Sequence, residues 1–377
     1  MSNTTKWMSK LTSDFGKIAA DMPKPTDAVI PLASPSLNWA IGNGGLVVGK
    51  ACCFFGPESG GKSLLMQLTL IQIQKQDPSA ICILFDAEYS FNPTWFSKLG
   101  GDLDRLVVRQ TNDPLKIFDY MYGEMLEMIQ EGAPIRAVAI DSVKSIKYPK
   151  DNKKQSTDLT MGGGGASYLG SALKHITPVI RENNITCLLV QQVYEEMDQY
   201  KQMRNPYKIP DGRALKHFCD YMIQVEKLET KDGVIEIEKG NIHGGASQIG
   251  HKVRAKFKKN RVGAPYRTAQ FTLDYEHGIV DTANEIFDLA KSLNIVYHPI
   301  NEETGKENVQ MWKFGKHDAI RGEANMRQFV TSSLQIQKEV IEACNNASEE
   351  VLEQRNQAMT MTEINMDSDD KLDINSL

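Results

Sequence analysis

The chain has 377 residues, a formal net charge of −5 and a hydrophobic fraction of 41%, which is enough for a substantial core. No apolar run reaches the length of about 18 residues that a membrane-spanning helix needs, and the polar start lacks the apolar segment of a signal peptide. We therefore expect a cytoplasmic protein without a membrane partner. The six cysteines lie mostly in apolar runs and form no C-x-x-C pair, which favours buried thiols over a metal site.

The negative charge is concentrated at one end of the chain. Residues 346–377 hold eight acidic side chains and two basic ones, so residues 1–345 carry a net charge of +1. Overall acidity therefore does not exclude a polyanionic partner. We expect residues 346–377 to be a disordered acidic tail. It could compete with DNA for basic surfaces, recruit a partner, or only keep the protein soluble.

Residues 1–28 predict a short amphipathic helix followed by a linker. Apolar side chains recur at helical spacing from Trp7 to Ala19, and the predicted helix ends before Pro23. So short a helix is only marginally stable by itself and needs a surface on which to pack. Its own domain and a neighbouring subunit are both open at this point.

A glycine-rich stretch with the spacing G-x-x-x-x-G-K-[ST] follows an apolar run and precedes a helical pattern. Glycines allow backbone N–H groups to turn toward phosphate oxygens at the start of a helix. Lys62 can reach the β- and γ-phosphates, and the Ser63 hydroxyl can bind Mg²⁺. The context favours a nucleotide site over a turn that binds nothing. The predicted ATP-binding residues are Gly56, Pro57, Glu58, Ser59, Gly60, Gly61, Lys62 and Ser63.

From residue 29 to residue 275 the chain alternates short β-rich runs with helical patterns, which predicts an α/β core. Uniformly apolar strands indicate burial on both faces, so we expect a mostly parallel sheet flanked by helices. The expected strands are Ala51–Phe55, Ile81–Phe85, Ala137–Ile140 and Cys187–Val190. The expected helices are Leu64–Gln74, Pro114–Gln130 and Ala166–Arg181.

Polar residues follow three of these strands, at the edge where ligands of parallel sheets bind. Asp86 and Glu88 follow the second strand, Asp141 the third, and Gln191 and Gln192 the fourth. Asp141 suits an acid that holds Mg²⁺ through water, and Glu88 suits a base that accepts a proton from the attacking water. A single acid is more often a helix cap, but their convergence on the glycine-rich loop favours catalysis.

Three cationic segments are candidates for DNA contact. The connections 144–165 and 194–212 are long and rich in lysine or tyrosine, which suits phosphate contact and base stacking, although solvated surface explains either alone. Residues 252–258 alternate basic and apolar side chains, which predicts a strand with one cationic face. Its targets would be DNA phosphates or a nucleotide held by a neighbouring subunit. Residues 276–345 predict a small C-terminal α/β domain, with helices at Ala283–Leu293 and Ala324–Cys344.

These features resemble the RecA recombinases from about Leu32 to Cys344. The matching motifs are Gly56-Pro57-Glu58-Ser59; Asp86-Ala87-Glu88 with Asn92-Pro93 and Lys98-Leu99-Gly100; Ala139-Ile140-Asp141-Ser142-Val143; Met161-Gly162; Ala214-Leu215-Lys216; and Lys259-Asn260-Arg261-Val262-Gly263-Ala264-Pro265. The resemblance implies a RecA-type P-loop ATPase that uses ATP and Mg²⁺. It implies a homo-oligomeric helical filament on single-stranded DNA that pairs with homologous double-stranded DNA and exchanges strands. Single-strand binding or mediator proteins are further expected partners.

The resemblance also implies roles for individual residues. Glu88 would be the catalytic base, Gln192 the γ-phosphate sensor, and Lys259 and Arg261 would reach the γ-phosphate of the adjacent protomer, on which the N-terminal helix would pack. Near adenine it places Asn92, Trp95 and Tyr275. The implied DNA contacts are Met161, Gly162, Gly163, Lys174, Met197, Arg204, Gly212 and Arg213.

Several departures indicate a divergent member, from a bacterial cell or a phage-infected host. Ala166 and Ser167 stand where the family offers DNA an arginine, for which Lys174 could substitute, and the second loop begins with acidic residues. Gln191 replaces the usual asparagine, and Arg261 replaces a lysine. Two alternatives share parts of this pattern. A hexameric ring helicase would have the P-loop and acids but not the 259–265 stretch, and a non-catalytic DNA-binding mediator would have no need of Lys62 and Glu88.

Overall fold

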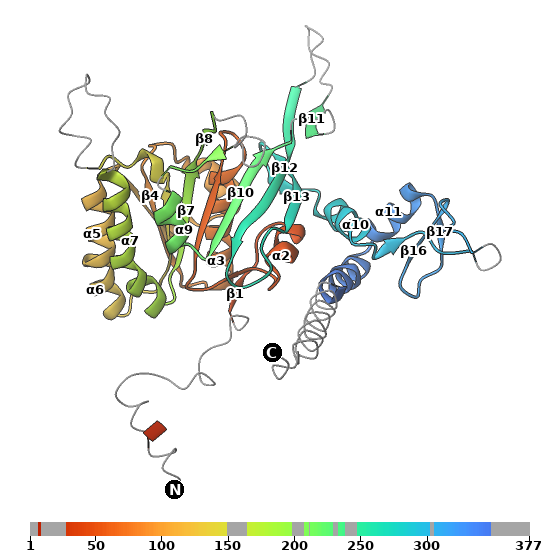
Figure 1. The fold of residues 1–377 in the computed structure, drawn as a ribbon, viewed down its shortest axis with the longest axis horizontal. Coiled ribbons are helices and arrows are strands. Elements are labelled where there is room, and N and C mark those ends of the chain that lie inside the picture. The colour runs from red at the N-terminus through yellow and green to blue at the C-terminus, as the bar shows by residue number, and fades with distance from the viewer. Residues whose placement is uncertain are drawn as a thin grey trace, which may run out of the picture.

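The computed structural model describes residues 7–8, 28–148, 164–197, 207–210, 212–228, 233–237, 247–301 and 305–347. Within these ranges the chain forms a large α/β core, with a smaller C-terminal unit beside it (Figure 1). Trp7 and Met8 are helical and exposed. The rest of the predicted N-terminal helix lies outside the described residues, as does the predicted tail beyond residue 347. Four predicted DNA contacts are also outside them: Met161, Gly162, Gly163 and Arg204.

A ten-stranded sheet forms the centre of the core, in the order β14-β13-β12-β10-β3-β7-β6-β4-β5, with β11 paired to β12. The strands from β10 to β5 pair in parallel, and β11 to β14 are antiparallel. The prediction of a mostly parallel α/β sheet is confirmed. The strands are β3 (Ala51–Gly56), β4 (Ile81–Asp86), β5 (Leu106–Gln110), β6 (Ile135–Asp141), β7 (Thr186–Gln192), β10 (Tyr221–Lys227), β11 (Val234–Ile237), β12 (Ser247–Asn260), β13 (Thr268–Asp274) and β14 (Gly278–Val280).

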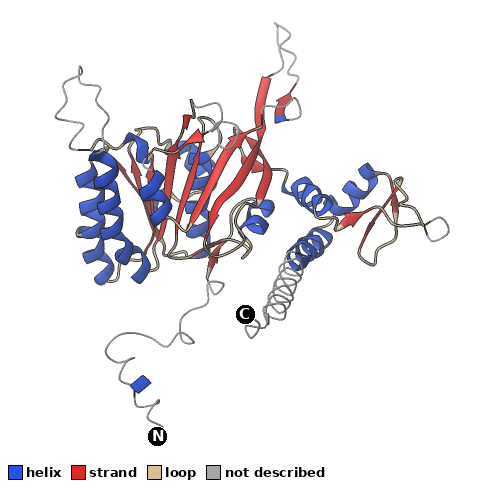
Figure 2. Ribbon diagram, in the orientation of Figure 1, coloured by secondary structure: helices blue, strands red, loops and turns tan. Residues whose placement is uncertain are grey.

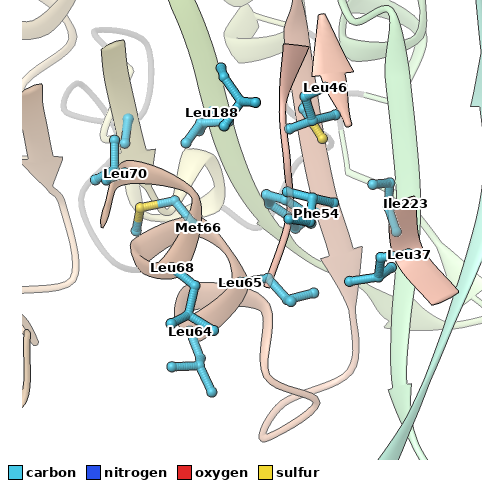
Figure 3. Close-up of a cluster of buried hydrophobic side chains, with 14 of the residues drawn as sticks. Leu37, Leu46, Phe54, Leu64, Leu65, Met66, Leu68, Leu70, Leu188 and Ile223 are labelled. Atoms are coloured by element: carbon cyan, nitrogen blue, oxygen red, sulfur yellow. The ribbon is translucent and has the colours of Figure 1, made fainter. Parts of the chain in front are cut away.

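Helices cover both faces of this sheet (Figure 2). Because neighbouring side chains of a strand point to opposite faces, Cys52 and Phe54 of β3 join one buried cluster, and Cys53 and Phe55 join the other. Figure 3 shows the first cluster, where leucines of the helix after β3 surround Phe54. This cluster is covered by α2 (Pro35–Ile41), α3 (Lys62–Gln76) and α4 (Pro93–Lys98). The second is covered by α5 (Pro114–Tyr122), α6 (Glu124–Gln130), α7 (Gly164–Glu182) and α9 (Gly212–Phe218).

Short elements complete the core. They are β1 (Val29–Ile30) paired with β2 (Leu46–Val47), β8 (Tyr194–Glu195) paired with β9 (Tyr207–Lys208), and the 3₁₀ helices η2 (Leu103–Arg105) and η3 (Val143–Ser145). The β8–β9 pair gives the predicted 194–212 loop a hairpin at its base, which the sequence analysis did not anticipate. All six cysteines are free and buried, as predicted. Among the described residues, no helix has both the length and the apolarity to cross a membrane.

Two helices predicted as continuous are broken. The expected helix Pro114–Gln130 is divided into α5 and α6 at Gly123, whose φ of −96° and ψ of −98° are not helical. The expected helix Ala324–Cys344 is divided into α11 (Glu323–Thr331) and a helix over 334–347. Here the Ser333 hydroxyl accepts a hydrogen bond from the N–H of Ile336 at 3.5 Å, so this serine begins a new helix.

The C-terminal unit has a buried cluster of its own, which includes Phe287, Trp312 and Met326. It combines α10 (Thr282–Ser292), α11 and the sheet β15 (Val296–Tyr297), β16 (Met311–Phe314) and β17 (Ile320–Arg321). The predicted domain limits at 28, 275 and 345 stay a prediction.

Glu285 of α10 connects this unit to the core. Its Oε1 accepts hydrogen bonds from the Ser34 hydroxyl at 2.5 Å and from the Ser36 N–H at 2.6 Å. Ser34 is also the N-cap of α2, so one carboxyl group orders the start of that helix and the position of α10. Burial raises the pKa of Glu285, and within the described part of the chain its buried Oε2 has no hydrogen-bond partner.

We predict that the Glu285 carboxyl makes stability fall as the pH rises. Its pKa is higher in the folded than in the unfolded chain, so its favourable contribution is complete below the unfolded value of about 4.3 and is lost as the pH rises through the folded value. Glu285→Gln keeps the accepting oxygen and removes the charge. Its urea midpoint should therefore vary less than that of the parent between about pH 5 and about pH 8, a range that begins roughly one unit above the unfolded pKa. Glu285→Ala should lose about 1–3 kcal/mol at both. Equal pH dependence in the parent and the glutamine variant would contradict this prediction.

Candidate active site

The glycine-rich loop connects the end of β3 to the start of α3 and lies tightly against β10. A Cβ atom on Gly56 would be 2.0 Å from the carbonyl oxygen of Val225, and one on Gly60 would be 2.9 Å from it. Gly61, the N-cap of α3, has a φ of +93° and offers no side-chain cap to the helix. The first N–H groups of α3 are therefore left for an external anion, at the positive end of the helix dipole.

Lys62 and Asp141 face each other at this loop. The Lys62 ammonium donates to the Pro57 carbonyl at 2.5 Å, and burial lowers its pKa although Asp141 and Glu88 oppose the shift. Burial raises the pKa of Asp141 to about 6, and a hydrogen bond from the Ser63 hydroxyl opposes this rise. The Asp141 Oδ1 is buried and has no hydrogen-bond partner among the described residues. A hydroxyl beside an unsatisfied carboxylate oxygen fits Mg²⁺ held directly by Ser63 and through water by Asp141.

Hydrogen bonds to one oxygen of Glu88 bring together residues at the ends of three strands. Its Oε1 accepts hydrogen bonds from the Ser142 hydroxyl, from the Ser145 hydroxyl at 3.2 Å and from Gln192 Nε2 at 3.0 Å. The polar ends of β4, β6 and β7 therefore converge beside the glycine-rich loop, as predicted. A carboxylate with this position can accept a proton from a water molecule at the phosphates.

Two of the polar strand ends have structural work instead. The Asp86 carboxylate accepts hydrogen bonds from the N–H groups of Ser90 and Phe91 and from Gln110 Nε2, each at 3.0–3.1 Å. It therefore shapes the turn that presents Glu88. Gln191 is buried and donates to the Pro210 carbonyl at 3.2 Å, so it holds the end of the second loop rather than the site.

The predicted adenine side lies where α4 meets the turn after β13. The Asn92 side chain accepts a hydrogen bond from the Trp95 N–H at 3.0 Å, so its oxygen is used as the N-cap of α4. Trp95 is half-buried against the core, and Tyr275 is 43% exposed. An ion pair of 3.4 Å between Lys98 and Glu276 joins the two segments. Trp95 and Tyr275, which the resemblance placed near adenine, thus belong to segments in contact.

Lys259 and Arg261 lie far from the glycine-rich loop of their own chain. Lys259 donates to the carbonyls of Lys216 and, at 2.6 Å, Cys219, and Arg261 donates to the His217 carbonyl at 3.1 Å. These carbonyls belong to the end of α9 and to the residue that follows it. Pairing of β10 with β12 and β3 puts these cations beside the beginning of β10, whereas the glycine-rich loop is beside its end, roughly 13 Å further along the strand.

The predicted cationic strand is β12. Lys252, Arg254, Lys256 and Lys258 alternate along it with the buried Val253, Ala255 and Phe257, which confirms the predicted faces. Lys174 and Arg213 line a groove of about 780 Å³ between α7 and α9, and Gly212 begins α9 beside them. Met197 is 96% exposed near the start of the second loop.

Lys144, a residue that the sequence analysis assigned only to a loop, also belongs to this site. Its ammonium donates to Gln192 Oε1 at 2.9 Å and lies 4.6 Å from the ring centroid of Tyr194. The available signal was its position three residues after Asp141, at the edge where the polar strand ends meet.

Comparisons with known proteins identify similar sequences. The family model for the RecA N-terminal domain matches residues 6–280. The chain is 28% identical over 316 residues to a mitochondrial DNA repair protein recA homolog of Dictyostelium discoideum. The matched region covers 80% of this chain and 65% of that protein, just under two thirds. It is 28% identical over 298 residues to the protein RecA of Aquifex pyrophilus, covering 77% of this chain and 78% of that protein. It is 26% identical over 337 residues to the protein RecA of Thermus aquaticus, covering 88% and 90% respectively.

Proposed function

The chain belongs to the RecA family, and on that premise we propose that it is a recombination protein with DNA-dependent ATPase activity. It forms a helical filament on single-stranded DNA, pairs that strand with homologous duplex DNA and exchanges strands in the cytoplasm. One observation carries the proposal. The sheet has a P-loop with Glu88 and Asp141 at one end and the cations Lys259 and Arg261 at the other, so the ends of two protomers complement each other.

Within one protomer, each residue has a distinct task in ATP hydrolysis. The N–H groups of the P-loop and the Lys62 ammonium bind the phosphates, and Ser63 and Asp141 hold Mg²⁺. When bound, Mg²⁺ neutralises negative charge on the phosphate oxygens. Glu88 orients the attacking water and accepts its proton. Gln192, which donates a hydrogen bond to Glu88, acts as the γ-phosphate sensor.

The adjacent protomer supplies the remaining positive charge. Lys259 would exchange its carbonyl acceptors for the γ-phosphate of the neighbour, because hydrogen bonds between ions are stronger than those to neutral oxygens. Arg261 would leave the His217 carbonyl and its 3.7 Å ion pair with Asp220 for the same phosphate. A contact that joins one end of a subunit to the opposite end of the next generates a ring or an open helix. Hydrolysis then depends on assembly, and assembly on nucleotide.

Two cationic surfaces support DNA as the polymer on which assembly occurs. The β12 face carries four basic side chains in line, and the groove between α7 and α9 presents Lys174 and Arg213. Phosphate neutralisation by such side chains supplies most non-specific DNA affinity. Single-strand binding or mediator proteins would assist loading, and the residues after 345 are a candidate segment for recruiting them.

We predict that ATP hydrolysis rises when single-stranded DNA is added, and that electron microscopy with a non-hydrolysed ATP analogue shows helical filaments. Lys62→Ala, which removes the phosphate-binding ammonium, should show neither hydrolysis nor nucleotide-dependent filaments. Closed rings would instead favour a hexameric helicase. ATP hydrolysis that does not respond to DNA would favour a non-catalytic mediator role.

Glu88→Gln should retain binding of ATP and of single-stranded DNA while turnover falls about a hundredfold or more, because the amide cannot accept the proton. Steady-state ATP hydrolysis measures turnover, and filter-binding assays run in parallel measure the binding of ATP and of single-stranded DNA. Glu131→Gln, at an exposed residue after α6, is the control for loss of one negative charge. Undiminished turnover in Glu88→Gln would assign proton acceptance to another group.

A mixture of two inactive variants tests the contact between protomers. Glu88→Gln lacks the base but keeps the binding of ATP and DNA on which assembly depends, and Lys259→Ala lacks the cation proposed to act on the neighbour. In an equal mixture, an interface is intact when Lys259→Ala supplies the P-loop with its Glu88 and Glu88→Gln supplies the opposite end, so about a quarter of the interfaces should be active. The ATPase rate measures the recovery. Activity no higher than the sum of the separate variants would refute the trans contact.

A further inference from the structure

A continuous chain of contacts leads from Glu88 to the second loop. Glu88 Oε1 accepts from Gln192 Nε2 at 3.0 Å, and Gln192 Oε1 accepts from the Lys144 ammonium at 2.9 Å. The same ammonium lies over the ring of Tyr194, the first residue of β8. Lys144 thus contacts both the last residue of β7 and the first residue of the hairpin that begins the loop.

Lys144 determines how the Gln192 carboxamide is oriented. A carboxamide can rotate so that its oxygen and nitrogen exchange places, and the two orientations occupy almost the same volume. An ammonium group can only donate, so it bonds the oxygen and turns the NH₂ group toward Glu88. The Glu88 carboxylate, which can only accept, favours the same orientation, so the ammonium and the carboxylate hold the carboxamide from its two ends.

The other contact of Lys144 reaches the loop. Tyr194 is 52% exposed, and its strand pairs with β9, in the register Tyr194 to Lys208 and Glu195 to Tyr207. These two strands are the beginning and the end of the segment predicted to bind DNA. An ammonium over an aromatic face attracts it, so a displacement of Lys144 changes the preferred position of the Tyr194 ring and of the hairpin.

A phosphate bound at the nucleotide site would displace the Lys144 ammonium. Lys144 donates to Gln192, and Gln192 donates to Glu88 beside the glycine-rich loop, so the Lys144 ammonium lies at the same edge of the sheet as Lys62. A terminal phosphate bound at this edge would attract both cations. The phosphate would then compete with Gln192 and Tyr194 for Lys144.

We infer that Lys144 is a positioning residue that fixes the Gln192 carboxamide against Glu88 and couples the nucleotide site to the β8–β9 hairpin. The inference rests on the proposed function, because it explains how bound ATP changes the affinity of the second loop for DNA. Lys144 is supplied by the same protomer as the P-loop, and its role is distinct from those of Lys259 and Arg261.

Three variants of one residue test this coupling. Lys144→Met keeps an apolar stem without the donor, Lys144→Ala removes both, and Lys144→Arg keeps a cation that donates and stacks. Lys116→Ala, at an exposed residue of α5, is the control for loss of charge. The measurements are kcat and KM for ATP with saturating single-stranded DNA, and the increase in DNA affinity that an ATP analogue causes.

With Lys144→Met and Lys144→Ala, kcat should fall about tenfold while KM changes less than about twofold, since ground-state binding of ATP uses other groups. The analogue-dependent gain in DNA affinity should fall about tenfold as well. Lys144→Arg should restore most of both, and Lys116→Ala should match the parent. A purely structural role would lower the thermal midpoint without a split between kcat and KM.

Other results would overturn the inference. Parent-like coupling in Lys144→Met and Lys144→Ala would show that Gln192 and Tyr194 are positioned without the lysine. An equal loss in Lys116→Ala would show that only the net charge matters. A parent whose hydrolysis ignores DNA overturns the proposed function and this inference together, whereas a stimulated parent with stimulated Lys144 variants overturns the inference alone.

Discussion

The register of the parallel strands is the constraint on which the site depends. Gly56 is the pairing partner of Gln192, and Asp86 is that of Asp141, so the strands end at one level and their polar side chains meet. Because side chains alternate between faces, a slip of one residue would turn Gln192 away from Glu88. Two apolar clusters, one on each face, hold this register. The positions of the polar groups are therefore determined mainly by hydrophobic packing, which is non-directional by itself but specific once the strands are paired.

In the proposed filament, the same topology divides the nucleotide site between two molecules. Strand β12 runs antiparallel to β10, so it ends beside the beginning of β10, at the opposite end from the P-loop. Lys259 and Arg261 follow at that point and are too distant for the phosphates of their own chain. A complete site then requires repeated head-to-tail contact, and each protomer added completes the site of a neighbour. Filament growth and catalysis would both depend on this head-to-tail contact between protomers.

Much of the core was predictable because its signals are local. Apolar runs identified β3, β4, β6 and β7, and the alternation along 252–258 identified the two faces of β12. The break at Gly123, the hairpin at Tyr194 and the structural role of Asp86 were not predicted. Each depends on partners far along the chain or on one backbone conformation, which periodicity does not record. Lys144 was missed for the same reason, since only the fold brings it to Gln192.

The cations proposed to bind phosphate share one feature, which is a neutral oxygen as hydrogen-bond acceptor. Lys62 donates to a backbone carbonyl, Lys144 to a carboxamide oxygen, and Lys259 to two carbonyls at the end of α9. Such neutral acceptors satisfy a half-buried ammonium well enough to keep it ordered. They bind it less strongly than a phosphate oxygen does, because the latter is charged. In the proposed mechanism, ATP would replace weaker contacts by stronger ones at each cation, and the released carbonyls and the Gln192 side chain are the groups through which binding would alter the loop and the interface.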